Sequence, residues 1–484
     1  MPKTPATYQL DIDFRDCLQE AYAQDALNYV KSLDCSAEHL QPLSPTSMPA
    51  GSSATGSVPG SVPGSVPGFV TPSSTCSNAL PPNDPLLPPP SVNSQEQQRR
   101  RKHANLNRLK KRALARAGRS ALDYKPREQH MHKTAEAGRF KVETDLGGSS
   151  RAAEGAWIGL NNYKQKRGQP RTLEGYKEAG FRILKWDGLE TITLTDKQGM
   201  VFGVLCGRPA DSPGKTWAES CEGVTTALRQ AEADLDFDGS PIIPEISSEK
   251  KGKNAKNRRG KFKTASMGVS YGGGQSVPAE LSHTEENQRV LDALKSNPDF
   301  IRMVKYGSSM FAYYAPRLYN NYANTFLRLQ QNQPELQLPV VGSIFSAISL
   351  NLGGQVVAEL HKDFKNLAYG LCHICALGSF DPELSGQLIL FELGLIIEFP
   401  PHSSILITSA VISHGNISLQ VGEERFSVIQ YTAGGIFRWV EYGCRTESQF
   451  AKEEPEEAAR VWNERPERWK EAISLFSHIS EIAK

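Results

Sequence analysis

The chain has 484 residues, a length that allows two to four domains. Its formal net charge is +2, and it contains eight scattered cysteines. A mean hydropathy of −0.43 and the lack of any apolar run of about 18 residues argue against a transmembrane span, and we expect no secretion signal at the start. The cysteines are too sparse for a disulfide framework, so a reducing compartment is expected.

Residues 1–98 are predicted to be mostly disordered, with one short helix. Apolar side chains recur at near-helical spacing in residues 14–33, which predicts a short amphipathic helix that becomes ordered on a partner. Residues 41–93 are rich in Pro, Ser and Gly, and Ser-Val-Pro-Gly occurs three times in tandem in residues 57–68. This composition buries too little apolar surface to offset the entropy of ordering, so it predicts a disordered linker.

Residues 99–150 are predicted to be a basic arm or linker. Residues 99–119 contain ten Lys and Arg and no acidic residue. Such a run predicts a nuclear-localisation signal or an arm that contacts nucleic-acid phosphates, with a solvated basic tail as the alternative. Because nothing local offsets the self-repulsion of this run, we favour the functional interpretation and expect a nuclear protein.

Residues 151–342 are predicted to be an α+β region that packs on the remainder of the fold. Its expected strands and helices cover residues 183–186, 191–195, 201–206 and 216–233, followed by two helices within 284–332. A second basic run occupies residues 249–263. This insert either follows a nucleic-acid backbone or is an ordinary surface loop.

Residues 343–445 consist of short β-rich segments separated by turns. Eight strands are predicted there, over residues 343–352, 355–363, 370–377, 387–391, 396–399, 404–408, 414–419 and 425–432. So many short strands are typical of a jelly roll or barrel rather than of alternating strands and helices. The remaining residues, 446–484, predict a tail of one or two charged helices with Pro466 between them.

Three polar side chains in the β-rich region form a candidate metal centre. His361 and Asp363 are two positions apart on a predicted strand, so their side chains share a face. A single histidine, His414, follows 53 positions after His361. Two imidazoles and one carboxylate are the ligand set of the non-haem Fe(II) facial triad, which leaves coordination positions open for a cosubstrate and oxygen.

Arg425 and Ser427 follow His414 closely and also share a strand face. A guanidinium in this position can pair with the far carboxylate of a dicarboxylate such as 2-oxoglutarate, and a serine hydroxyl can add a hydrogen bond. The alternative is that both histidines simply end strands and that Arg425 is a solvent-exposed charge. The combined pattern favours the metal and 2-oxoglutarate interpretation.

Two neighbouring motifs are weaker candidates for chemistry. Cys372 and Cys375 resemble half of a zinc site, but no second cysteine pair lies at a usable distance. On a strand their side chains would point to opposite faces, so buried packing is the favoured interpretation. His402 follows two prolines in a predicted turn and is expected to be a surface histidine.

These motifs resemble the TET/JBP family of Fe(II)/2-oxoglutarate dioxygenases. The resemblance rests on His361-Lys-Asp363-Phe-Lys-Asn366, on His414 and on Arg425-Phe-Ser427. Residues 399–410 and 430–439 resemble the family's fungal members, which occur in many copies, often beside transposable elements. The resemblance is good over roughly residues 343–443 and looser back to about residue 155.

The resemblance implies a double-stranded β-helix (jelly-roll) core. Together with the helices and the N-terminal region predicted above, the expected fold is α+β, with flanking support helices and a long disordered N-terminal region. It implies an enzyme that oxidises methylated bases in DNA stepwise with O2. By residue, it implies Fe(II) held by His361, Asp363 and His414. It also implies 2-oxoglutarate held by Arg425 together with Ser427.

The resemblance further implies DNA as the partner, with the target base flipped out of the duplex and contacted by Asn366. Animal TET proteins have a base-contacting histidine eight positions after the arginine, where this chain has Ala433. Both 5-methylcytosine and N6-methyladenine therefore stay open as targets. Two alternative functions also stay open: a 2-oxoglutarate oxygenase acting on a protein or small molecule, and an inactive DNA-binding protein derived from a mobile element.

Overall fold

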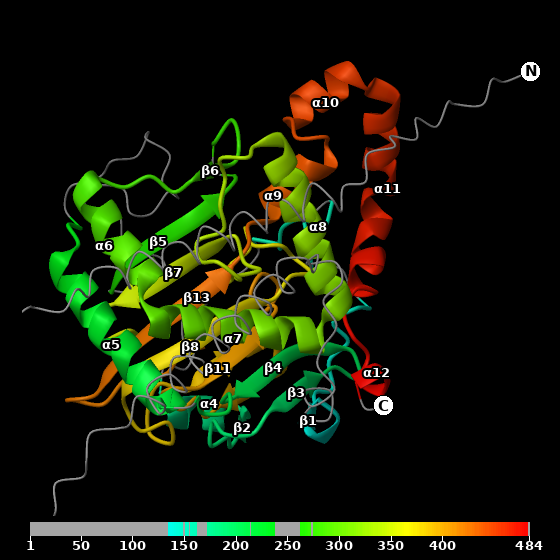
Figure 1. The fold of residues 1–484 in the computed structure, drawn as a ribbon. Helices are drawn as coiled ribbons and strands as arrows, with labels where there is room; N and C mark the ends of the chain where they lie inside the picture. The colour runs from blue at the N-terminus through cyan, green and yellow to red at the C-terminus, as the bar shows by residue number, and fades with distance from the viewer. Residues whose placement is uncertain are drawn as a thin grey trace, which may run out of the picture. The chain divides into compact units, whose positions relative to one another are not determined.

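The computed structural model describes residues 134–148, 151–153, 155–161, 172–212, 214–237, 262–272 and 274–482 (Figure 1). These residues belong to one compact unit, Ala121–Lys484. The predicted helix at residues 14–33, the Pro/Ser/Gly-rich linker and the basic run at 99–119 lie outside the described residues, as do residues 249–261 of the second basic run.

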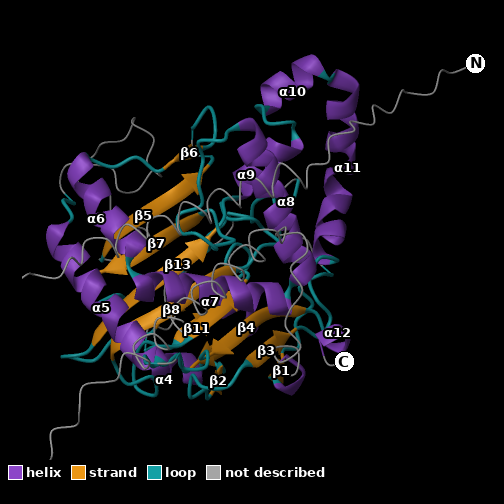
Figure 2. Ribbon diagram, viewed as in Figure 1, coloured by secondary structure: helices purple, strands orange, loops and turns teal. Residues whose placement is uncertain are grey.

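The described part of the chain is a mixed α+β fold built on two β-sheets (Figure 2). The larger sheet has, in spatial order, the strands β1 (Gly138–Lys141), β3 (Ile192–Thr195), β4 (Val201–Gly207), β11 (Ser404–Ile407), β8 (Cys372–Ser379), β13 (Glu424–Tyr431), β7 (Ala347–Leu352), β5 (Lys263–Ser270) and β6 (Ala279–Glu280). The smaller sheet has the strands β12 (His414–Asn416), β9 (Leu388–Leu390), β10 (Leu395–Ile397) and β2 (Arg182–Leu184). Strands are antiparallel to their neighbours except in the pairs β1–β3 and β2–β10.

The strands after β6 form a double-stranded β-helix. After the two strands β7 and β8 of the larger sheet, the chain passes to β9 and β10 in the smaller sheet, returns to β11, crosses to β12 and returns to β13. A large apolar cluster joins the facing surfaces, with Ile374 and Ala376 from the larger sheet and Leu390 and Ile397 from the smaller. Strands from residues 151–342 extend both sheets, because β4 pairs with β11 and β2 pairs with β10.

Seven of the eight strands predicted within residues 343–439 are present, and the strand predicted at residues 355–363 is wrong. In that segment the structure has only isolated bridges, between Gln355 and Arg425 and between His361 and His414. The segment leaves the larger sheet at its first residues and reaches the smaller sheet at His361. Because its partner strand changes along its length, no continuous ladder of hydrogen bonds can form.

Helices cover the outer face of the larger sheet, where α5 (Trp217–Asp234) and α7 (Pro298–Tyr314) lie across the strands (Figure 1). With α6 (Glu285–Ser296) and α8 (Pro316–Asn332) between and after them, residues 284–332 form three helices, so the prediction of two was wrong. Pro298 and Pro316 each begin a new helix, because proline fits the first turn of a helix but interrupts its interior.

The remaining helices are short or C-terminal. They are α4 (Leu173–Glu178), the 3-10 turn η2 (Phe391–Leu393), α9 (Gly434–Glu441), α10 (Glu447–Glu453), α11 (Pro455–Ile473) and α12 (Ile479–Ile482). Pro466 lies inside α11, so the predicted break at this proline was wrong, and the chain instead breaks before Pro455. In the described part of the chain, no helix combines the length and apolar character needed to cross a membrane.

The side chains of β8 confirm the packing interpretation of the cysteine pair. Cys372 belongs to the apolar cluster between the sheets, whereas Cys375 belongs to the cluster under the helices. Burial raises the pKa of the Cys375 thiol well above its ordinary value, so this thiol stays protonated. His402 is in a turn with φ of 65° and is partly buried rather than fully on the surface.

Candidate metal centre

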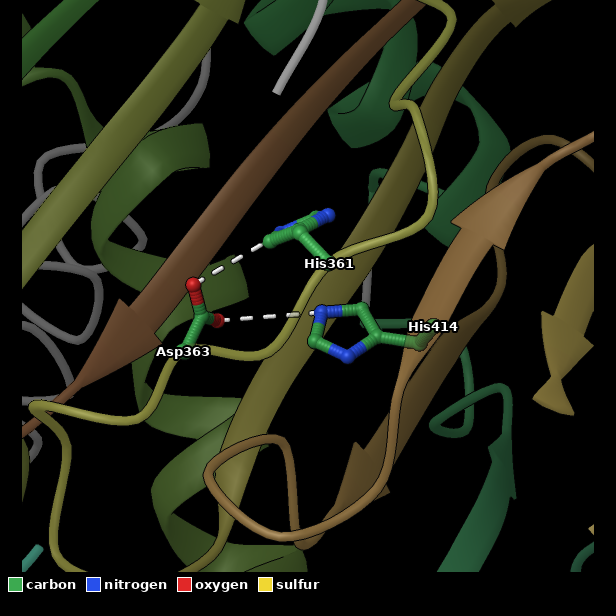
Figure 3. Close-up of side chains that lie close together, drawn as sticks. All are labelled: His361, Asp363 and His414. Atoms are coloured by element: carbon green, nitrogen blue, oxygen red, sulfur yellow. Dashed lines mark ion pairs between the residues drawn. The ribbon is translucent and has the colours of Figure 1, made fainter. Parts of the chain in front are cut away.

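The side chains of His361, Asp363 and His414 converge on one point (Figure 3). One potential ligand atom from each lies within 4.8 Å of the other two. The two carboxylate oxygens of Asp363 lie 3.6 Å from Nε2 of His361 and 3.7 Å from Nε2 of His414. These separations are longer than hydrogen bonds, so the three groups face a shared space rather than simply binding one another.

Backbone pairing brings the two histidines together. The amide of His361 donates to the carbonyl of His414 at 2.9 Å, and the amide of His414 donates back at 2.9 Å. Residues paired in this way present their side chains on one face, and the two ring centroids are 4.5 Å apart. The amide of Asp363 donates to the carbonyl of Ser409 at 3.1 Å, which brings its carboxylate to the same place.

The hydrogen bonds of the imidazoles determine which nitrogen can bind a metal. Nδ1 of His361 lies 2.7 Å from the carbonyl of Glu359, and Nδ1 of His414 lies 3.0 Å from the carbonyl of Ile412. Because a carbonyl only accepts, each Nδ1 carries a proton, and Nε2 is the nitrogen of each ring that faces Asp363 and could bind a metal. Two neutral imidazole nitrogens and one carboxylate are a donor set that fits Fe(II).

Arg425 provides a cationic site between the two sheets. On β13, Ser427 pairs with Ala376, which faces the smaller sheet, and Phe426 pairs with Leu377, which faces the helices. Arg425 and Ser427 therefore point inward, as alternate residues of a strand do. The Arg425 side chain is 2% exposed, and burial lowers its pKa to about 10.

The guanidinium of Arg425 has aromatic neighbours and no counter-charge among the described residues. Its Cζ lies 5.8 Å from the centre of the Phe380 ring and 5.9 Å from that of the Phe399 ring. Its Nε donates no hydrogen bond to any described residue. No carboxylate in the part of the chain that the structure describes forms an ion pair with Arg425. A buried, unpaired cation costs several kcal/mol, and this cost is recovered when an anion binds.

Asn351 prepares Ser427 to act as a hydrogen-bond donor. Nδ2 of Asn351 donates to Oγ of Ser427 at 2.9 Å, and both side chains are buried. Because Oγ of Ser427 accepts this bond, its own proton is left to donate to a ligand. The sequence analysis did not single out Asn351, although a lone amide in the apolar strand β7 was the available signal.

Asn366 lies close to the metal centre and next to Ala433. Its amide donates to the carbonyl of Asp363 at 2.8 Å, and an isolated bridge pairs it with Ala433. Its Nδ2 lies 3.4 Å from Oγ of Ser409. The two positions that the sequence analysis linked to the target base are therefore neighbours, and Asn366 is partly buried.

No protein-family model matches the chain, and no curated protein sequence matches it. Among solved structures the chain is similar to NgTET1 in complex with 5mC DNA, with 12% identity and a TM-score of 0.35 over 53% of this chain and 83% of that one. It is also similar to an oxidoreductase of the 2OG-Fe(II) oxygenase family from Burkholderia pseudomallei, with 16% identity and a TM-score of 0.21 over 35% of this chain and 66% of that one. Both overlaps are loose, so the chemistry of the site rests on its own residues.

Proposed function

We propose that this chain is an Fe(II)/2-oxoglutarate-dependent dioxygenase that oxidises methylated bases in DNA. The observation that carries the proposal is the buried Arg425 guanidinium, which has no anionic partner in the described part of the chain and lies inside the same β-helix as the triad. Two histidines and a carboxylate alone suit several metals and reactions. A triad with a buried, unpaired cation in the same β-helix suits an oxygenase that consumes a dicarboxylate.

One group of residues in the site would bind the metal, and a second group would bind the cosubstrate. His361, Asp363 and His414 would hold Fe(II) on one side and leave the other side open. When bound, the iron supplies the redox activation of O2. Arg425 and Ser427 would bind the far carboxylate of 2-oxoglutarate through charge-assisted hydrogen bonds, which give orientation as well as affinity.

Two aromatic rings shield the Arg425 guanidinium from solvent. Phe380 and Phe399 are both buried and both lie beside the guanidinium. A low local dielectric strengthens the interaction of a cation with a carboxylate, because water does not compete for either group. The same burial makes Arg425 a poor partner for neutral ligands, which would leave its charge uncompensated.

DNA is the proposed substrate, on the strength of the motif that continues from Asp363 to Asn366. A base inside a duplex cannot reach a metal enclosed by two sheets, so the target base would be flipped out and contacted by Asn366. The basic runs at residues 99–119 and 249–263 would contact phosphates without reading the sequence, and the first would direct the protein to the nucleus. Both 5-methylcytosine and N6-methyladenine are candidate targets.

The test is 2-oxoglutarate turnover with defined DNA. Full-length protein would be incubated with Fe(II), 2-oxoglutarate and duplexes that contain 5-methylcytosine, N6-methyladenine or no modified base. Succinate is measured, and the nucleosides are analysed by mass spectrometry. We expect succinate and an oxidised nucleoside with one of the methylated duplexes. We expect His361→Ala to abolish both while DNA affinity is retained, whereas His478→Ala, a control at an exposed histidine, keeps both.

Three outcomes would contradict the proposal in different ways. DNA binding without succinate from any duplex would favour the inactive DNA-binding protein. Succinate released equally with methylated and unmodified DNA would favour an oxygenase with a protein or small-molecule substrate. Succinate release that persists in His361→Ala would refute the assignment of the metal centre to His361, Asp363 and His414.

A further inference from the structure

One carboxylate, that of Glu392, contacts both chain segments that carry the candidate histidine ligands. Glu392 lies in the turn η2, between β9 and β10 of the smaller sheet. Its Oε1 accepts a hydrogen bond from Oγ of Ser413 at 2.7 Å and lies 3.2 Å from Nζ of Lys362. Its Oε2 accepts from the backbone amide of Ser413 at 2.7 Å.

Both partners of Glu392 are sequence neighbours of proposed ligands. Lys362 lies between His361 and Asp363, and Ser413 directly precedes His414. Adjacent residues of an extended chain point to opposite sides. Glu392 therefore ties the two segments together from the side opposite the ligands, without occupying the space where a metal would bind.

Backbone hydrogen bonds join the two histidine segments at a few points and not along a continuous ladder. His361 and His414 exchange two backbone hydrogen bonds, and the amide of Asn416 donates to the carbonyl of Ala358 at 2.9 Å, but the segment around His361 is not a regular strand. The separation of the two imidazoles therefore depends on side-chain contacts as well as on these backbone hydrogen bonds. The group Lys362, Glu392 and Ser413, here called the Glu392 clamp, supplies such contacts.

The side chains of the Glu392 clamp are largely buried, unlike those of an ordinary surface ion pair. The side chain of Lys362 is 10% exposed and that of Glu392 is 24% exposed, and Ser413 is fully buried. Lysine is rarely buried to this degree unless its charge is paired, because desolvation of an ammonium is costly. Hydrogen bonds to a charged acceptor are also about twice as strong as neutral ones.

We propose that Glu392 is a positioning residue of the metal centre, which sets the distance between His361 and His414 and so the affinity for the metal. The inference rests on the metal site of the proposed function but not on the identity of the substrate. Groups that orient metal ligands from behind commonly change metal affinity 10- to 100-fold when they are replaced, by an approximate general range. An ion pair that only stabilises the fold would leave the affinity of the folded protein unchanged.

The experiment compares metal binding in variants of the full-length protein. Co(II) is titrated as a spectroscopic probe into wild type, Glu392→Gln and Asp299→Asn, and the d–d absorption and melting temperature are recorded for each. Asp299 is the matched control, because it pairs with Lys215 at 2.6 Å, is 12% exposed, and lies in α7 on the outer side of the larger sheet. Glu392→Gln keeps the size of the side chain but removes the ion pair between Glu392 and Lys362.

We expect Glu392→Gln to raise the Co(II) dissociation constant about 10- to 100-fold and to shift the d–d bands. Asp299→Asn should lose stability but bind Co(II) as wild type does. Wild-type affinity and an unchanged spectrum in Glu392→Gln would overturn the inference. If Glu392→Gln does not fold, Ser413→Ala decides: weaker Co(II) binding supports the clamp, and unchanged binding overturns it. Wild-type protein that binds no Co(II) would instead refute the metal centre and, with it, the proposed function.

Discussion

The substitution Arg425→Met tests two effects of this cation separately: the loss of stability caused by its burial, and its contribution to binding an anion. Burial lowers the pKa of Arg425 to about 10, which at about 1.4 kcal/mol per pKa unit corresponds to roughly 3 kcal/mol lost from the free energy of unfolding. The loss is fully present below pH 10, because the group is charged in both states there, and it disappears as pH rises above this value. Methionine fills a similar volume without a charge, so Arg425→Met should be as stable as the ligand-free wild type or more stable, by up to about 3 kcal/mol.

The same substitution should remove the stabilisation by 2-oxoglutarate. A ligand that binds only the folded state at 100 times its dissociation constant adds about 2.7 kcal/mol to the free energy of unfolding. Urea denaturation, followed by tryptophan fluorescence with Co(II) present, would be measured with and without 2-oxoglutarate. Wild type should gain stability from 2-oxoglutarate, and Arg425→Met should gain none.

Arg229→Met is the control for the substitution at Arg425. Arg229 pairs with Glu424, next to Arg425 in sequence, and its side chain is 44% exposed. Arg229→Met should change the stability by about 1 kcal/mol or less and should retain the response to 2-oxoglutarate. If Arg425→Met is several kcal/mol less stable than ligand-free wild type, Arg425 has a stabilising partner in the folded protein, and the prediction is refuted. An equal response to 2-oxoglutarate in that variant would place the cosubstrate elsewhere.

Three further predictions concern the triad, a buried histidine and a close backbone contact. His414→Ala should abolish the d–d absorption of bound Co(II) in a protein that still melts cooperatively, and an unchanged spectrum would exclude this residue as a ligand. Burial lowers the pKa of His373 from 6.5 to about 3, so only the unfolded chain gains this proton as pH falls. The free energy of unfolding should then drop by about 1.4 kcal/mol per pH unit below 6.5, and urea titrations should show a flatter pH dependence in His373→Leu. Gly434→Ala should cost about 2 kcal/mol or more in thermal denaturation, because its added Cβ would lie 1.8 Å from the carbonyl oxygen of Trp157, whereas a wild-type melting temperature would show that this backbone contact relaxes freely.

Local signals in the sequence were sufficient for most strands and for the long helices. Short β-rich segments bounded by turn residues located β8, β11 and β13 to within a few residues, and Thr216 capped α5 where the pattern predicted the helix to begin. The errors in the helices arose where the effect of proline depends on its position. Pro316 starts a helix where a continuous apolar stripe suggested one long helix, and Pro466 is accommodated inside α11.

The sequence by itself determined the residue types of the site and their approximate order along the chain. His361, Asp363 and His414 are recognisable because few other functions combine these side chains with a nearby Arg and Ser. Tertiary structure alone decided how they meet. The expected strand around His361 is absent, and the two histidines face the same space because their backbones pair across 53 positions of sequence. Burial and pairing depend on contacts between distant segments, which is why the unpaired charge of Arg425 and the Glu392 clamp have no signal in the sequence.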